Sequence, residues 1–316
     1  MKLRNKILFA RARVAIFALI LATGFSWQPT LVSAQKTHEP ATPGSSPRAS
    51  QTPAHPFEPT EELVYVAEFS RALLKRVDVA DFRFTASKQP ALEKVSDRVP
   101  ARDKSGASYL LKFTGDVSSK GFFAKLFNLR FREQIESIVD PASFTVTRTN
   151  KVDEQGKRAR ISETVYRDGR VIWIERDPNN PSRPPREVVA TFAGQVQDVL
   201  SAIYFLRTQP LEVGRSFDIT VSDSGVVYQI PVQVIEKKRK KTALGRVEAF
   251  RVDPQVFGPN RLISEEGQFS IWITNDTRRV PVSARIKLKY GTFDITLRKV
   301  IRNAVPESVA GTSNDN

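Results

Sequence analysis

The residues with the clearest chemical potential in this sequence are cations. Residues 237–241 form an uninterrupted basic run, and a second pair of arginines precedes Val280. Clustered Lys and Arg side chains attract anionic surfaces, although many charge runs only solvate an exposed face. We expect either a solvated face or a contact with anionic lipid, lipopolysaccharide or cell-wall polymer, which includes peripheral contact with a membrane. The candidate contact residues are Lys237, Lys238, Arg239, Lys240, Lys241, Arg278 and Arg279.

Aromatic and aliphatic side chains offer a second kind of site, a cavity for an apolar ligand. Three of them lie on an apolar helical segment, and Trp272 lies on an alternating segment near the C-terminus. Aromatic residues are also common in ordinary cores and strands, so simple packing is the alternative for each. The candidate cavity-lining residues are Leu200, Tyr204, Phe205 and Trp272.

Catalytic constellations are not evident in the sequence. The chain has no Cys, and both histidines, His38 and His55, lie in a Pro-rich stretch. We therefore expect a folded part without Cys nucleophiles, His bases or transition-metal ligands, and no cofactor. Glu265 and Glu266 are adjacent, so on a strand they point to opposite faces. A distant carboxylate pair would leave no local motif, so a glycosidase stays open as the enzymatic alternative to a non-catalytic protein.

The N-terminus has the organisation of a secretory signal. Five basic residues precede an apolar stretch at 14–22, and small residues at 32–34 predict cleavage between Ala34 and Gln35. The apolar stretch is short for a membrane span, although an uncleaved anchor is the alternative. No Cys follows the predicted site, which excludes a lipidated N-terminus of the bacterial lipoprotein type. The sequence thus predicts a periplasmic or secreted protein that does not meet nucleic acid, despite its net charge of +15.

Composition divides the chain into four parts. Residues 1–34 are the predicted signal peptide, and the Pro-rich residues 35–60 predict a disordered or extended linker. Residues 61–302 predict a β-rich domain, and residues 303–316 lose all periodicity, as a frayed tail does.

The elements that must position these side chains are mainly strands. From Val280 to Tyr290, apolar residues alternate with Ser283, Arg285, Lys287 and Lys289. Alternation of this length is typical of antiparallel strands with one buried and one wet face. Similar short runs, separated by turn signals such as Asp168-Gly169, recur along the chain. They predict an all-β fold, a single antiparallel curved sheet or open barrel of roughly a dozen strands.

One helix interrupts the strands. Over 195–207 a helical stripe of apolar residues is widened by Ala202, Tyr204 and Phe205, and Pro210 ends the segment. A helix that is apolar nearly all round is buried on several sides, so we expect the curved sheet to wrap around it.

Three segments resemble the exported bacterial domain-of-unknown-function family numbered 3108. They are DVLSAIYFLR at 198–207, LEVGRSF at 211–217 and IWITNDTRRVPV at 271–282, in the same order and spacing. The resemblance extends over about 61–300 and implies an exported protein without an assigned activity. The last segment is also similar to a hairpin of periplasmic lipoprotein carriers, which are open barrels with a helix in an apolar cavity. This second likeness is architectural, and a fold does not determine a function.

Two functional hypotheses follow. The first is a non-catalytic protein that binds an amphipathic or anionic envelope component, with apolar groups inside the sheet and charged groups on its basic rim. The second is a structural or partner-binding module whose interior is filled. The sequence does not decide between them.

Overall fold

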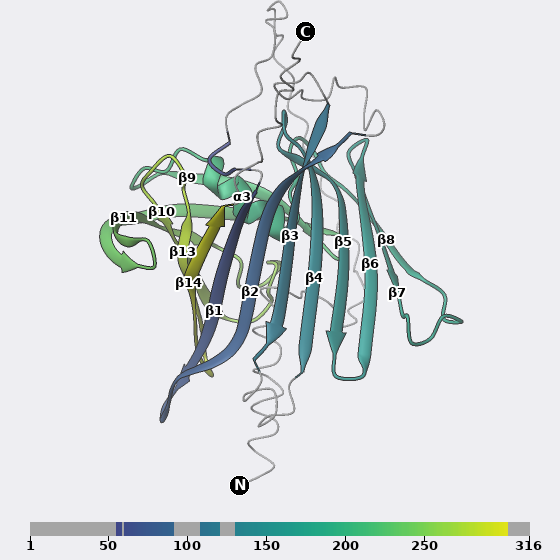
Figure 1. Ribbon diagram of the computed structural model, residues 1–316. Helices are drawn as coiled ribbons and strands as arrows, with labels where there is room; N and C mark the ends of the chain where they lie inside the picture. The colour runs from purple at the N-terminus through teal and green to yellow at the C-terminus, as the bar shows by residue number, and fades with distance from the viewer. Residues whose placement is uncertain (1–54, 59, 92–107, 121–129, 303–316) are drawn as a thin grey trace, which may run out of the picture.

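The computed structural model describes residues 55–58, 60–91, 108–120 and 130–302, and its main feature is one antiparallel sheet of 14 strands (Figure 1). The sheet is not closed, and one helix packs against it, as the sequence predicted. The strands are β1 (Glu61–Arg71), β2 (Leu74–Pro90), β3 (Tyr109–Ser119), β4 (Phe131–Asp140), β5 (Thr145–Gln155), β6 (Arg158–Arg167), β7 (Arg170–Arg176), β8 (Arg186–Thr191), β9 (Ser216–Asp223), β10 (Val226–Thr242), β11 (Gly245–Pro254), β12 (Gly267–Thr274), β13 (Pro281–Leu288) and β14 (Gly291–Arg302).

The first and the last strand of the chain lie side by side in the sheet. The order is β8-β7-β6-β5-β4-β3-β2-β1-β14-β13-β12-β11-β10-β9, so β1 pairs with β14 in the middle of the sheet. The sheet therefore consists of two meanders, β1–β8 and β9–β14, and its two edges are β8 and β9. The two edges lie close together. Gly225, in the turn after β9, is so near Val188 of β8 that a Cβ added at Gly225 would lie 2.7 Å from the Val188 side chain. The described part of the chain thus curves almost into a ring.

The helix α3 (Val199–Thr208) joins the two meanders and packs against β3, β4 and β9 (Figure 1). Its first residues are capped by Asp198, whose side chain accepts a bond from the backbone of Ser201 while Ser201 caps in return. The expected start at residue 195 was therefore too early. Gln197 is extended instead, and its backbone bonds to Thr220 and Ser222 beside β9.

The predicted register of the strand after Val280 is confirmed. Val282, Ile286 and Leu288 are buried, whereas Arg285, Lys287 and Lys289 are exposed. Because successive side chains point to opposite faces of a strand, this burial pattern shows which side chains of β13 and of its neighbouring strands face the core.

Aromatic rings fill the space between the helix and the first meander. Tyr204 stacks on Phe113 with ring centroids 3.9 Å apart, and Phe57 meets both rings edge-on. Phe57 is 5% exposed, so His55 and Phe57 pack against the core, which the Pro-rich composition of this stretch did not indicate. The expectation of a folded part without His was wrong for His55, because its ring stacks on Phe57 and meets the edge of Phe144.

Two further differences concern strands. The sequence analysis did not predict β8, a six-residue edge strand in which no side chain is buried. Strand β2 is the second difference: despite its C-terminal proline, it continues to Pro90, which lies opposite Tyr109 of β3. The predicted signal peptide and the tail at 303–316 lie outside the described residues. Among the described helices, none is long and apolar enough to span a membrane.

Candidate functional site

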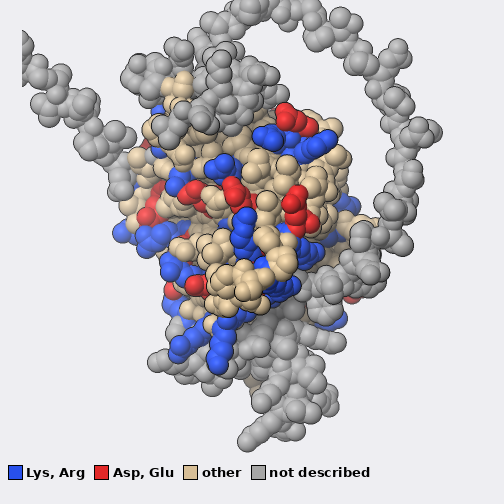
Figure 2. All heavy atoms as spheres, turned by 90° about the vertical axis from the view of Figure 1, so that its right-hand side faces the viewer, with Lys and Arg blue, Asp and Glu red and all other residues tan. Residues whose placement is uncertain are grey.

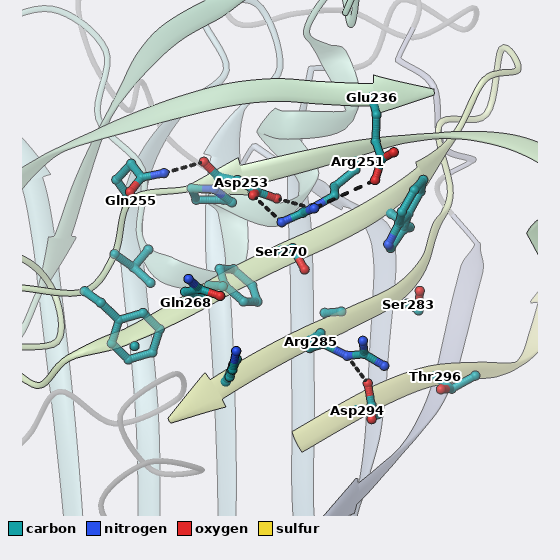
Figure 3. Close-up of a pocket in the computed structure, with 18 of the residues that line it drawn as sticks. Glu236, Arg251, Asp253, Gln255, Gln268, Ser270, Ser283, Arg285, Asp294 and Thr296 are labelled. Carbon is teal, nitrogen blue, oxygen red and sulfur yellow. Dashed lines mark hydrogen bonds and ion pairs between the residues drawn. The ribbon is translucent and has the colours of Figure 1, made fainter. Parts of the chain in front are cut away.

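A groove lies over strands β10 to β14, on the face of the sheet opposite the helix (Figure 3). Ile271 and Ile273 of β12 pack in the same apolar cluster as Leu206 of the helix. The alternate residues Ser270 and Trp272 therefore face the other side and line the groove. Its volume is about 600 Å³. Volumes of this order are common for small-molecule sites.

Neighbouring strands add polar side chains to the same face. Trp272 pairs with Ser283, and Ser270 pairs with Arg285, in the register of β12 and β13. The groove therefore combines three aromatic residues with many hydrogen-bonding groups. The polar and aromatic lining residues are Glu236, Lys240, Arg251, Asp253, Gln255, Phe257, Gln268, Phe269, Ser270, Trp272, Ser283, Arg285, Lys287, Asp294 and Thr296.

Two arginines of the groove are paired with carboxylates (Figure 3). Arg251 bonds to Asp253 at 2.7 and 2.9 Å and lies 3.7 Å from Glu236. Arg285 donates to Asp294 at 2.6 Å. Burial raises the pKa of Asp253, partly offset by its bonds from Arg251. All three groove carboxylates are thus engaged by arginines of the groove itself.

Two lysines of the groove are not paired in this way. Lys240 Nζ lies over the ring of Trp272, 3.9 Å from its centroid. Within the described ranges, neither Lys240 nor Lys287 has a carboxylate within ion-pair distance. Burial and the nearby Arg285 lower the pKa of Lys240. The groove thus contains two lysines that make no ion pair with any residue that the structure describes.

The basic run 237–241 does not form a single surface, because it lies in strand β10 and its side chains alternate. Lys240 enters the groove, Lys238 pairs with Glu236, and Lys237 lies 3.7 Å from Glu248. Arg239 and Lys241 are exposed and point away from the groove side.

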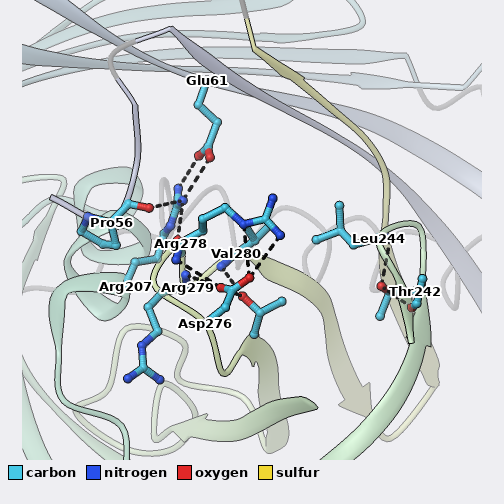
Figure 4. A network of polar contacts seen from close by, with 11 residues as sticks. Pro56, Glu61, Arg207, Thr242, Leu244, Asp276, Arg278, Arg279 and Val280 are labelled. Atoms are coloured by element: carbon cyan, nitrogen blue, oxygen red, sulfur yellow. Dashed lines mark hydrogen bonds and ion pairs between the residues drawn. The ribbon is translucent and has the colours of Figure 1, made fainter. Parts of the chain in front are cut away.

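The pair Arg278 and Arg279 lies in the turn between β12 and β13 and points partly inward (Figure 4). Arg278 pairs with Asp276 at 3.1 Å. The guanidinium of Arg279 lies over the ring of Phe250, 5.4 Å from its centroid. Both side chains are half-buried, so the turn offers less free charge than its sequence suggests.

Charge elsewhere on the surface is mixed. Figure 2, which shows the side where β6 to β8 lie, has Lys and Arg side chains interspersed with Asp and Glu. The positive excess of the chain is therefore not concentrated on this face.

The helix residues that the sequence singled out lie in the interior, not in the groove. Tyr204 is part of the aromatic stack, and Phe205 packs against Phe144 with centroids 5.8 Å apart. Leu200 is buried and lines a small interior cavity of about 60 Å³. The structure therefore separates Trp272 from Leu200, Tyr204 and Phe205, because Trp272 lies on the opposite face of the sheet.

That interior cavity lies between the helix and strands β4 to β7, and its walls carry charges. Lys151 Nζ lies 3.4 Å from Glu133 and 4.0 Å from Asp223, and all three side chains are buried. Burial raises the pKa of Glu133 to about 8, even though Lys151 opposes the shift. Burial alone would lower the pKa of Lys151, but Glu133, Asp223 and Asp153 outweigh it and raise the pKa.

The cavity beside the helix is small, and its lining includes charged side chains. A volume of about 60 Å³ accommodates a few water molecules and no alkyl chain. A charged lining is also unfavourable for a lipid tail.

A second buried ion pair holds the helix in place (Figure 4). Arg207 donates to both carboxylate oxygens of Glu61, at 2.6 and 3.2 Å, and to the backbone oxygen of Arg278 at 2.9 Å. It also bonds to the oxygen of Pro56 at 3.4 Å. One side chain thus connects α3, β1, the β12–β13 turn and the segment before β1.

Sequence reasoning missed both buried ion pairs, and it missed most of the groove. Lys151 alternates with Thr149 and Asp153, which are also buried. Its position in the alternation of β5 could therefore have indicated that it faces the interior. Arg207 lies at the end of an apolar helix, where a charge needs a partner. The partner Glu61 begins strand β1, 146 residues away in the sequence, and no local pattern indicates it.

Metal binding and catalysis find no support in these features. Across the residues that the structure describes, no group of three or more His, Cys, Asp or Glu side chains is placed to hold a metal ion.

Comparison with known proteins identifies the family. Residues 101–298 match the family described as "Protein of unknown function (DUF3108)", and the chain belongs to this family. The resemblance found in the sequence is thereby confirmed. A comparison with curated proteins finds no match.

Two solved structures are similar in parts of their fold. One is a β-barrel-like protein of the domain of unknown function DUF1849 from Brucella abortus, with 9% identity, a TM-score of 0.45, and coverage of 78% of this chain and 98% of that chain. The other is described as a "putative lipoprotein" from Parabacteroides distasonis, with 11% identity, a TM-score of 0.26, and coverage of 79% and 100%.

Proposed function

We propose that this protein is a non-catalytic protein of the bacterial envelope that binds the anionic saccharide part of an envelope component in the β10–β14 groove. The observation that carries the proposal is the position of Lys240 and Lys287. Both cations line the groove without a carboxylate partner among the described residues, and Lys240 lies over the ring of Trp272. Export rests on the predicted signal sequence.

The chemistry of the groove suits such a ligand. The two lysines would neutralise phosphate or carboxylate groups, as compact point charges do. Gln255, Gln268 and Ser270 supply donors and acceptors for hydroxyl groups. The free parts of the Trp272 ring offer an apolar surface to a sugar ring. Lipopolysaccharide and cell-wall polymer share this chemistry.

The small cavity beside the helix also supports the placement of the ligand outside the sheet. About 60 Å³ with a charged lining leaves no room for an alkyl chain. The same observation favours the second candidate, a structural or partner-binding module with a filled core. That candidate requires no small ligand in the groove.

The test is a binding measurement with purified lipopolysaccharide and, separately, with cell-wall sacculi, at low and high salt. We expect binding that weakens as salt rises, because exposed charges are screened. Each lysine near an anionic group contributes roughly 1 kcal/mol, so Lys240→Gln and Lys287→Gln should each weaken binding about fivefold. Lys289→Gln is the matched control, since Lys289 is exposed at the end of β13 and does not line the groove.

The two probes distinguish the sources of the ligand. Binding to only one of them identifies the source. If the two groove variants bind both probes as well as the Lys289 control does, the groove is not the binding site. Native mass spectrometry of protein purified from its own envelope provides an independent check, since the filled-module candidate predicts no co-purifying glycan.

A further inference from the structure

The hairpin between β1 and β2 ends in an exposed apolar pair. Ala72 and Leu73 form the turn, since Arg71 pairs with Leu74. Leu73 is 99% exposed, more than any other large apolar residue among those described, and Val213 follows at 56%. Leu74 is 39% exposed. Figure 1 shows this hairpin extending beyond the neighbouring strands at the lower left. Soluble surfaces carry single apolar residues often, but a projecting pair at a tip suggests contact with another apolar phase.

Cations surround the apolar pair. Arg71, Lys75 and Arg76 lie within three residues of Leu73. Arg76 is bound to Glu68 at 2.8 Å, and the nearest acid along β2, Asp78, is bound to Lys120 at 3.0 Å. Arg71 and Lys75 make no ion pair with any residue that the structure describes. The tip is therefore apolar at its end and positive around its base.

The tip is attached to a well-packed base. Phe69, two residues before Arg71, is buried against Phe293 of β14 with centroids 4.8 Å apart. Glu68 also accepts a bond from Arg298 at 3.1 Å, and Ser70 accepts one from the backbone of Arg76. These contacts hold the hairpin so that its leucines project away from the core.

We propose that the β1–β2 tip is a docking element for an anionic lipid bilayer. Leu73 and Leu74 enter the boundary between head groups and acyl chains, and Arg71 and Lys75 contact lipid phosphates. Apolar burial and attraction to anionic lipids act together in interfacial binding. Two leucines and two cations give a weak, reversible contact, far from the permanent insertion of a spanning helix. Charge complementarity favours a membrane over an apolar protein pocket, because lipid phosphates lie directly above the apolar layer.

The absence of Cys in the chain permits a site-specific probe. Leu73→Cys is labelled with an environment-sensitive fluorophore, and Val213→Cys, labelled in the same way, is the control. On addition of phosphatidylglycerol-containing vesicles, we expect a blue shift at position 73 and none at position 213. Vesicles of phosphatidylcholine alone should give a smaller shift. An unchanged emission at position 73 with anionic vesicles overturns the proposal.

Sedimentation with the same vesicles measures the affinity. Replacing both leucines, Leu73→Ser with Leu74→Ser, should weaken binding about tenfold or more, since burial of each leucine is lost. Arg71→Gln with Lys75→Gln should weaken binding and reduce its dependence on salt. Val213→Ser should bind as the unaltered protein does. Equal binding by the double-leucine variant overturns the proposal, and so does failure of the unaltered protein to bind at low salt.

This docking element is independent of the groove. The Lys240→Gln and Lys287→Gln variants retain the tip, so they should still give the shift at position 73. A protein that loses saccharide binding but keeps the shift supports the two proposals separately.

Discussion

Lys151 in the interior and Lys240 in the groove illustrate two ways in which this sheet holds a partly buried lysine. Lys151 lies among Glu133, Asp223 and Asp153, and their charges raise its pKa. Lys240 lies over Trp272 without a carboxylate partner, and burial with Arg285 lowers its pKa. The interior thus compensates its cation, while the groove leaves its cation available. We therefore assign Lys151 a structural role and Lys240 a role in ligand binding.

The first prediction concerns the two faces of β13, and it should give the largest effect. Ile286→Asp places a charge in the core and should destabilise the fold by about 4 kcal/mol or more, because the charge has no partner there. Lys287→Asp changes the groove face of the same strand and should cost about 0.5 kcal/mol or less. Urea denaturation of both variants provides the measurement. Equal and small losses would mean that the two faces have been assigned incorrectly.

The second prediction compares the two lysines directly. Lys151→Met removes the cation and leaves Glu133 and Asp223 buried next to each other, so it should cost about 3 kcal/mol. Lys240→Met removes no ion pair and keeps an apolar contact with Trp272, so its cost should stay below about 1 kcal/mol. Thermal unfolding at neutral pH measures both changes. A larger loss of stability in Lys240→Met than in Lys151→Met would contradict this prediction.

The third prediction concerns pH. The pKa of Glu133 is about 8 in the folded protein and ordinarily 4.5, so between these values the folded state holds a proton that the unfolded state has released. The free energy of unfolding should therefore decrease as pH rises from about 4.5 to about 8 through this group. Glu133→Gln cannot ionise and should reduce this decrease, with a gain of up to about 5 kcal/mol at pH 9 relative to the unaltered protein.

Denaturation curves at several pH values measure this effect, and Glu236→Gln is the control. Glu236 lies at the groove, where its bond from Lys238 lowers its pKa, so this variant should not flatten the profile. A profile that is unchanged in Glu133→Gln would show that Glu133 is ionised throughout the range.

The alternation of side chains made much of the fold predictable. The face assignments of β13 and the Asp168-Gly169 turn follow from neighbours in the sequence, because a strand exposes every second residue and a tight turn needs particular backbone angles. The helix was found from its apolar periodicity, but its start was misplaced by four residues, because Gln197 bonds to Thr220 and Ser222. The edge strand β8 was missed, since a strand without buried side chains carries little hydrophobic signal.

The sequence by itself determined that the protein has an antiparallel sheet, one buried helix, and a domain without disulfides. These properties depend on residue type and local period, which a single segment contains. Only the tertiary structure decided that β1 pairs with β14, that Arg207 meets Glu61, and that Lys240 lies over Trp272. Each of these contacts joins residues that are distant in the chain, and they depend on the curvature and order of the whole sheet. Strand β10 directs alternate side chains to opposite faces. Of the basic run at 237–241, only Lys240 therefore lines the groove, and the other four side chains are exposed to solvent.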